Sequence, residues 1–267
     1  MGRVLKEGMS GQDVVDLQEA LLLAGFPAGN IDGAFGPGTE AAVLGFQRSQ
    51  GLLADGIAGR RTLAALKLAA DIPLRDVFSQ VPIRVVSKMF PFTPLDNIKR
   101  YTPSILSSLE SADLCDSSMV LMAFSTIRAE AECFKPIDEG ISRFNTSPGG
   151  HPFDLYDNRR DLGNRGRPDG ERYKGRGFVQ LTGRFNYQRY SKLLGMGNRL
   201  LDEPELANDD TTAADLLAFF LKDKEVPIKQ ALLNRDFLRA RRLVNGGSHG
   251  IERFTECFKI GEGYIQD

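Results

Sequence analysis

An internal repeat in the first 70 residues places the strongest constraint on how this chain can fold. Residues 31–43 read IDGAFGPGTEAAV, and residues 54–66 read ADGIAGRRTLAAL. Asp-Gly pairs favour turns, because Gly accepts a positive φ and Asp bonds its own backbone. Each copy therefore predicts a turn that leads into a helix, whose start a Thr hydroxyl could cap. The two copies share Asp32/Asp55, Gly33/Gly56, Gly36/Gly59 and Thr39/Thr62.

A further helix is predicted just before the repeat. Val14, Leu17, Leu21 and Ala24 fall on one face of residues 11–24 at helical spacing. Short helices joined by short turns are typical of a small bundle. We therefore expect a three-helix domain at residues 1–70.

The rest of the chain predicts a larger helical domain. Several prolines, beginning with Pro73 and Pro82, indicate a linker at 71–82 and a second domain at 83–267. Residues 209–224 and 237–244 have helical patterns, the first with Asp caps and the second ended by Gly246 and Gly247. The segment 145–177 is rich in Gly and Asn and predicts long loops, which are usually functional in a compact domain. We find no convincing alternating strands, so the fold class is mainly α.

Composition excludes several classes of function. The formal net charge of −1 argues against a nucleic-acid partner. Three widely spaced cysteines, Cys115, Cys133 and Cys257, and only two histidines provide neither a disulfide framework nor a zinc site. We expect no metal and no cofactor, and we interpret the cysteines as buried small hydrophobes.

Targeting signals and membrane spans are also not expected. No stretch approaches the roughly 18 apolar residues of a membrane span, and the first residues lack the apolar core of a secretory signal. We expect a monomer without membrane contact that is made in the cytoplasm and acts after release.

The segment 117–140 is the richest in candidate chemistry. Ser117 is a plausible helix N-cap, and Pro136 should stop the helix. Glu130 falls on the predicted buried stripe, whereas Glu132 falls well round toward the other side. A carboxylate on an apolar face is costly unless it is paired or functional. Glu130 is therefore either an ion-pair partner of Arg128 or another Arg, or a desolvated general acid. The stripe comprises Val120, Ala123, Ile127 and Phe134.

A second carboxylate follows nine residues later. Glu139 lies just past the predicted helix and is followed by Gly140. Glycoside hydrolysis typically uses two carboxyl groups that flank the scissile bond. A helix-borne Glu130 and a loop-borne Glu139 could face each other across a cleft.

The first 70 residues resemble the three-helix peptidoglycan-binding domain of many cell-wall hydrolases. The resemblance covers roughly residues 5–68 and includes the paired DGxxGxxT turns and the dipeptides Leu17-Gln18 and Phe46-Gln47. It implies peptidoglycan as a partner. The alternative for each residue is that it only builds turns and core. The candidate wall-binding residues are Asp32, Phe35, Thr39, Asp55 and Thr62.

Residues 171–190, ERYKGRGFVQLTGRFNYQRY, resemble the signature of family 19 glycoside hydrolases, which include chitinases and many endolysins. The resemblance extends over most of residues 84–262, with IRAEAECF around Glu130 and LVNGG at 243–247. It departs from the family at Ala129, where the family has His. It implies a lysozyme-like or chitinase-like helical domain with a central cleft.

The same resemblance implies a role for each matching residue. Glu130 would be the general acid, Glu139 the general base on water, and Thr182 a holder of that water. Sugar contacts would come from Gln180, Asn186 and Asn245, and Arg253 would steady the carboxylates. Thr182 could instead cap the following helix, Gln180 and Asn186 could satisfy backbone groups, and Arg176 could brace the Gly-rich turns.

Three functions remain open from sequence. The first is a muramidase that cuts the β-1,4-linked glycan of peptidoglycan with inversion, which the attached wall-binding domain favours. The second is a chitinase that uses the same machinery on N-acetylglucosamine polymers. The third is a wall-binding protein whose hydrolase domain has lost activity, for which Ala129 is the only support.

Overall fold

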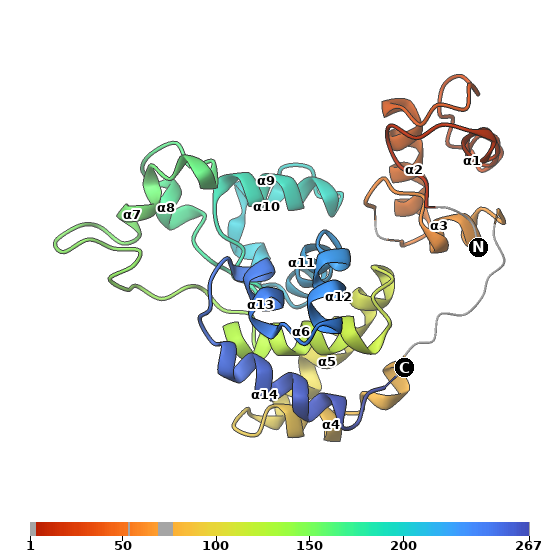
Figure 1. The fold of residues 1–267 in the computed structure, drawn as a ribbon. Helices are drawn as coiled ribbons and strands as arrows, with labels where there is room; N and C mark the ends of the chain where they lie inside the picture. Colours follow the sequence, from red (N-terminus) through yellow and green to blue (C-terminus); the bar gives the residue numbers. More distant parts are fainter. Residues whose placement is uncertain (1–3, 53, 69–76, 267) are drawn as a thin grey trace. The chain divides into compact units, whose positions relative to one another are not determined.

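The computed structural model describes residues 4–52, 54–68 and 77–266. The chain divides into two compact units, Met1–Pro73 and Leu74–Asp267, and each is helical (Figure 1). Within the described ranges the backbone pairs only as isolated bridges and forms no strand. The predicted fold class, mainly α, is confirmed.

The first unit consists of α1 (Gln12–Leu23), α2 (Pro37–Ser49) and α3 (Arg60–Ala65). Its apolar side chains form a core of their own, in which Phe26 and Phe46 meet edge to face with their ring centroids 5.8 Å apart. Burial of such side chains is the main force that holds a small bundle together. The core comprises Leu5, Val14, Leu17, Leu21, Ala28, Phe35, Ala42, Val43, Phe46, Ala58, Leu63 and Leu66.

One buried glutamine organises the first copy of the repeat. The Gln18 amide nitrogen donates to the Asp32 carboxylate at 3.0 Å and to the Thr39 hydroxyl at 3.1 Å. Its carbonyl oxygen accepts from the Gly33 N–H at 2.9 Å. A buried amide needs such partners, because leaving its polar atoms unpaired costs free energy. The first Asp-Gly turn is therefore fastened to α1.

The second copy repeats this arrangement around Gln47. Its amide nitrogen donates to Asp55 at 2.9 Å and to Thr62 at 3.1 Å, and its oxygen accepts from the Gly56 N–H at 3.0 Å. The repeat in sequence is thus a repeat in hydrogen bonding. Our expectation that the threonines cap helices is wrong, because α2 and α3 begin without a side-chain cap.

The predicted linker at 71–82 falls partly outside the described residues, since 71–76 are not among them. Its remainder packs into the second unit. Val77 and Val81 are buried, and the Val77 N–H donates to the Cys115 carbonyl at 3.1 Å. A short 3-10 helix, η1 (Phe78–Gln80), lies between them, and α4 (Ile83–Met89) starts where the second domain was expected to begin.

The other elements of the second unit are all helices, and one of them, α6, is buried among the others. They are α5 (Leu95–Ser111), α6 (Ser117–Glu130), α7 (Asp154–Asp157), η2 (Arg160–Leu162), α8 (Asp169–Arg172), α9 (Arg184–Leu193), α10 (Arg199–Asp202), η3 (Pro204–Asn208), α11 (Asp210–Lys222), α12 (Glu225–Leu233), α13 (Phe237–Asn245) and α14 (Ile251–Glu262). No helix in the described ranges is both long and apolar enough to cross a membrane.

Helix α6 forms the centre of this unit. Every residue from Met119 to Ala129 is buried, and α14, α11 and α12 pack against the helix, with α14 alongside it in Figure 1. A helix that is apolar on all faces is expected to be buried in this way. Its N-cap is Asp116, whose side chain accepts from the Met119 N–H at 3.2 Å, so the predicted cap at Ser117 is wrong by one residue.

The helix also ends earlier than predicted, at Glu130. Phe134 adopts a left-handed backbone with φ of 54° and so leaves the helix, yet its ring stays buried. It lies edge to face with Phe90, with a centroid distance of 4.6 Å, and stacks on Phe124. Aromatic packing after the helix, rather than helical register, keeps this stripe residue in the core.

Candidate functional site

Glu130 is the last residue of α6 and forms an ion pair with Arg241 of α13. The Arg241 Nη2 to Glu130 Oε1 distance is 2.7 Å, and the two side chains are 0% and 12% exposed. Arg241 Nε also donates to the His249 carbonyl at 3.0 Å. Glu130 therefore has an arginine partner of the kind that the sequence left open, although that partner is not Arg128.

Ala129, where the family has His, packs against a glycine backbone. Gly250 has φ of 73°, and a Cβ built there would lie 3.1 Å from the Ala129 Cβ and 3.0 Å from its carbonyl oxygen. Contacts of 3.0–3.4 Å are tighter than most real Cβ contacts. The start of α14 thus fills the space beside Ala129, which leaves room for only a small side chain at position 129.

The Glu132 carboxylate forms ion pairs with two other arginines. Its Oε1 lies 2.5 Å from Arg128 Nη1, and its Oε2 lies 2.8 Å from Arg253 Nη1. The hydrogen bond from Arg253, together with the charge of Arg128, lowers the pKa of Glu132. Arg253 also donates to the Ala129 carbonyl at 3.4 Å. The arginine predicted to steady the catalytic carboxylates is therefore bonded to Glu132, and Arg241 takes the place beside Glu130.

Glu139 lies in the long segment between α6 and α7, which Figure 1 shows extending from the helical body. Its N–H donates to the Gly175 carbonyl at 2.8 Å. Its Oε1 accepts from Asn145 Nδ2 at 3.0 Å and from the Tyr156 hydroxyl at 2.8 Å, and its Oε2 accepts from the Gly175 N–H at 3.1 Å. Three neutral donors thus orient this carboxylate.

Sequence reasoning missed Asn145 and Tyr156. Neither belongs to a motif that the sequence shows, and both reach Glu139 only through the folding of the loop. The only indication in the sequence was the length of the loop. A long loop predicts a functional role for residues 145–177 but does not identify which of them contact Glu139.

The signature segment forms a tight hairpin. Arg176 and Leu181 exchange backbone hydrogen bonds of 3.2 and 2.9 Å. Gly177, with φ of 78°, lies against the Ala207 carbonyl, where a Cβ would come within 2.8 Å. At Gly175 a Cβ would lie 2.8 Å from Gln180 Oε1 and 3.1 Å from Glu139 Oε2. Glycine at 175 therefore lets Glu139 and Gln180 approach the same stretch of backbone.

The other predicted residues of the signature bond to nearby backbone. Gln180 Nε2 donates to the carbonyls of Ile137 and Gly177, at 3.0 and 3.2 Å. The Thr182 hydroxyl donates to the Gln180 carbonyl at 2.8 Å, and Asn186 Nδ2 donates to the Thr182 carbonyl at 2.8 Å. Thr182 does not cap α9, which begins after Gly183 without a side-chain cap. All three side chains are half-buried, so part of each remains accessible.

Arg176 is buried within the same hairpin. Its Nη1 donates to the Arg172 carbonyl at 2.8 Å and to the Tyr187 hydroxyl at 2.9 Å, and its Nε lies 3.2 Å from Asp138. This is the bracing role that the sequence favoured for it.

Asn245 ends α13, one helical turn after Arg241. Its Oδ1 accepts from the Gly247 N–H at 3.0 Å, and its side chain is half-buried. The structure thus assembles the predicted residues into two groups. Glu130 pairs with Arg241 of α13, the helix that ends at Asn245, whereas Glu139, Gln180 and Thr182 are connected through the hairpin, and Asn186 of α9 bonds to the Thr182 carbonyl.

The candidate wall-binding residues of the first unit lie in its interior or on its turns. Phe35, Thr39 and Thr62 are buried, and Asp32 and Asp55 also accept from backbone N–H groups inside the turns. Phe35, Thr39 and Thr62 could touch a polymer only if this unit opened.

The cysteines are free thiols, of which Cys115 and Cys257 are buried and Cys133 is partly exposed. Burial raises the pKa of the Cys257 thiol to about 12, which keeps it protonated and unreactive at neutral pH. Within the described part of the chain, no three His, Cys, Asp or Glu side chains are grouped so that they could hold a metal ion.

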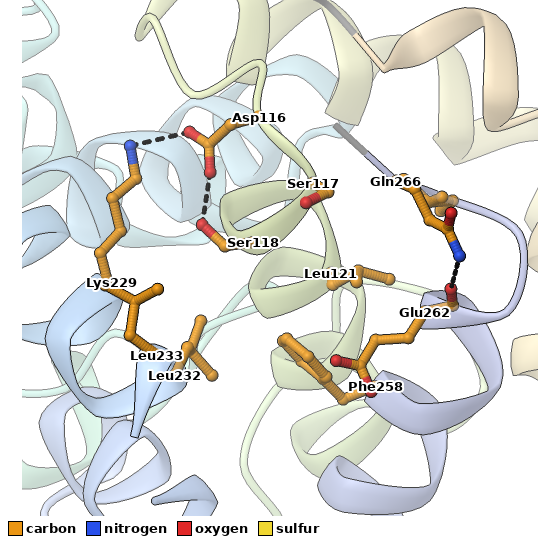
Figure 2. A pocket seen from close by; sticks show the side chains of 11 residues that line it. Asp116, Ser117, Ser118, Leu121, Lys229, Leu232, Leu233, Phe258, Glu262 and Gln266 are labelled. Atoms are coloured by element: carbon orange, nitrogen blue, oxygen red, sulfur yellow. Dashed lines mark hydrogen bonds and ion pairs between the residues drawn. The ribbon is translucent and has the colours of Figure 1, made fainter. Parts of the chain in front are cut away.

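A separate pocket of about 650 Å³ lies at the opposite end of α6 (Figure 2). At its rim Lys229 forms an ion pair with Asp116 at 2.8 Å. None of the predicted catalytic or sugar-binding residues lines it, so it is distinct from the candidate site. The lining residues are Asp116, Ser117, Ser118, Leu121, Lys229, Leu232, Leu233, Phe258, Glu262, Ile265 and Gln266.

Comparison with known proteins supports both resemblances. Residues 10–66 match the model of a putative peptidoglycan binding domain. A spore cortex-lytic enzyme of Bacillus cereus is 47% identical over 60 residues, which cover 22% of this chain and 23% of that enzyme. A glycosyl hydrolase family 19 domain-containing protein of Haemophilus influenzae is 30% identical over 105 residues, which cover 39% of this chain and 48% of that protein.

Chitinase C of Streptomyces griseus superposes with a TM-score of 0.45 at 20% identity, over 70% of this chain and 79% of the chitinase. The chain spans about a quarter of the first curated relatives that it matches and about half of the Haemophilus protein. It therefore carries an N-terminal peptidoglycan-binding domain and is also similar to a family 19 glycoside hydrolase.

Proposed function

We propose that this protein is a glycosidase that cuts β-1,4 bonds in the glycan strands of peptidoglycan. The observation that carries the proposal is a pair of carboxylates in contrasting surroundings. Glu130 meets a buried cation at the end of a core helix, whereas the three donors that orient Glu139 are neutral. Glycoside hydrolysis uses two such carboxyl groups, one that gives a proton to the leaving oxygen and one that takes a proton from water.

In the proposed reaction Glu130 acts as the general acid. It donates its proton to the glycosidic oxygen as the bond to the anomeric carbon breaks. Glu130 is then the carboxylate that pairs with Arg241 at 2.7 Å, and it takes up a proton from solvent before the next cleavage.

Glu139 acts as the general base. It accepts a proton from a water molecule, whose oxygen attacks the anomeric carbon from the face opposite the leaving group. The product therefore has the inverted, α configuration. Inversion needs about 6.5–9.5 Å between the two carboxyl groups so that the water fits, whereas a retaining enzyme needs about 5–5.5 Å.

The remaining residues of the signature would serve the sugar and the water. Thr182 lies two residues after Gln180 in the hairpin that holds Glu139, and we assign it to the attacking water. Gln180 in this hairpin, Asn186 in α9 and Asn245 at the end of α13 are half-buried amides suited to acetamido and hydroxyl groups.

Chitin is the alternative substrate, because the same two carboxylates would cut an N-acetylglucosamine polymer. The attached peptidoglycan-binding domain favours the cell wall, since tethering raises the local concentration of the enzyme on an insoluble polymer. Faster hydrolysis of chitin oligomers than of peptidoglycan would assign the protein to the chitinase reaction instead.

The division into two units leads to a prediction about the binding domain. A fragment of residues 1–73 should sediment with purified cell walls without degrading them, because its core and turns are complete within that range. A fragment of residues 77–267 should cut soluble glycan at the rate of the full chain but clear intact walls more slowly. Sedimentation and turbidity assays measure the two effects. If the first fragment stays in the supernatant, the binding role is wrong.

A further inference from the structure

Asn145 is a fully buried side chain with only one possible orientation. It is 0% exposed, and its Nδ2 donates to Glu139 Oε1 at 3.0 Å and to the Gly140 carbonyl at 2.8 Å. Its Oδ1 accepts from the Ser142 N–H at 2.8 Å and from the Thr146 hydroxyl at 2.9 Å. Reversing the amide would break the contacts with Glu139, the Gly140 carbonyl and the Ser142 N–H, so the nitrogen must face Glu139.

Tyr156 approaches the same carboxylate oxygen from α7. Its hydroxyl donates to Glu139 Oε1 at 2.8 Å. Burial and the adjacent Glu139 raise the pKa of Tyr156, so its hydroxyl remains protonated, and therefore a donor, throughout the neutral range. Two donors thus converge on one oxygen of Glu139.

The loop that carries these donors is braced at several points. The Leu155 N–H donates to the Asn145 carbonyl at 3.2 Å, which ties the two donor-bearing segments together. The Ser147 N–H donates to Asp154 at 2.7 Å. Asn164 links the Tyr156 carbonyl, at 2.8 Å, to the first N–H of α9, at 2.9 Å. The donors are therefore fixed relative to the signature hairpin.

The two carboxylate oxygens of Glu139 differ in how many further hydrogen bonds each can accept. A carboxylate oxygen accepts about two hydrogen bonds in its plane. Oε1 has both from Asn145 and Tyr156, whereas Oε2 has one, from the Gly175 N–H. Oε2 therefore keeps one lone pair that accepts no hydrogen bond from these three donors, whereas Oε1 keeps none.

We propose that Tyr156 and Asn145 are positioning residues that occupy Oε1 of Glu139 and leave Oε2 as the oxygen that accepts a proton from water. The inference rests on the proposed function, in which Glu139 is the base. In the step it describes, one water O–H bond breaks and its proton goes to Oε2. The water oxygen bonds to the anomeric carbon, and the departing glycosidic oxygen takes a proton from Glu130.

The test is Tyr156→Phe in the full chain, assayed on solubilised glycan strands. Removal of one donor to a charged group should lower kcat about tenfold or more. KM should stay within about twofold, because the hydroxyl acts on the base and not on the bound sugar. A purely structural role would change thermal stability and leave kcat of the folded enzyme unaltered.

Tyr190→Phe is the matched control. Tyr190 is also a buried tyrosine, and its hydroxyl donates to a carboxylate, Asp223 Oδ2, at 3.1 Å. That variant loses the same kind of hydrogen bond away from Glu139 and should keep its kcat. Equal kcat losses in both variants would overturn the positioning role, because the effect would then come from general destabilisation.

Comparison with Glu139→Gln separates the two proposals. If Glu139→Gln is inactive and Tyr156→Phe keeps its full kcat, the positioning role is wrong and the base assignment stands. If Glu139→Gln is fully active, the base assignment itself fails. As a second probe of the same oxygen, Asn145→Asp should also lower kcat at constant KM in protein that remains folded, because it replaces the donor with an acceptor.

Discussion

Glu130→Gln should reduce glycan cleavage by about 10²–10⁴-fold, the usual contribution of a general acid or base. Glutamine has the shape of glutamate but carries no proton that it can give to the leaving oxygen. Binding to the wall should not change, because we assign that binding to the first unit. Turbidity clearance of purified walls measures the loss, and near wild-type clearance would contradict the assignment.

The same substitution should also lower stability, since it leaves Arg241 buried without a counter-charge. Breaking a buried pair from one side costs up to about 3–5 kcal/mol, whereas replacing both partners is often neutral. The double variant Glu130→Gln with Arg241→Met should therefore recover stability without recovering activity. That result would separate loss of the acid from loss of the fold.

Glu132→Gln is the control for position and charge. Glu132 lies two residues from Glu130, but its side chain is 41% exposed and holds Arg128 and Arg253. We expect this variant to keep most activity and to lose some stability. An inactive but folded Glu132→Gln protein would mean that this cluster, rather than Glu130, carries the chemistry.

Glu139→Gln should be comparably inactive, because the attacking water then has no base to take its proton. Rescue by azide provides a more specific test of this prediction. Azide attacks the anomeric carbon without losing a proton, so it should restore cleavage in Glu139→Ala and yield an α-glycosyl azide while Glu130 still protonates the leaving oxygen. A β-configured azide product or a β initial product from the native enzyme, detected by proton NMR, would exclude inversion.

Features set by neighbours in sequence were predicted well. The paired Asp-Gly turns and the helix around residues 11–24 both follow from local spacing. Helical periodicity also placed Glu130 on the buried face of its helix, although it extended that helix beyond Glu130, where α6 ends. Each depends on contacts within a few residues, which a sequence pattern records directly.

Features set by distant contacts were not predicted. Arg241 is 111 positions after Glu130, and only the packing of α13 brings the two together. Arg253 matched a family pattern, yet Glu132 is its partner. Asn145 and Tyr156 reach Glu139 through loop folding that leaves no periodic trace. The threonines of the repeat bond to glutamines 15 and 21 positions away rather than to their own helices.

The proposed glycosidase activity is tested most directly by the chemistry of the ends that the enzyme creates. Purified peptidoglycan would be digested, reduced with borohydride and analysed by mass spectrometry. Reduced N-acetylmuramic acid is expected at the new ends, because the bond from N-acetylmuramic acid to N-acetylglucosamine is cut. Reduced N-acetylglucosamine would mean that the other glycosidic bond is the target. New peptide termini without any new reducing sugar would contradict the glycosidase assignment altogether.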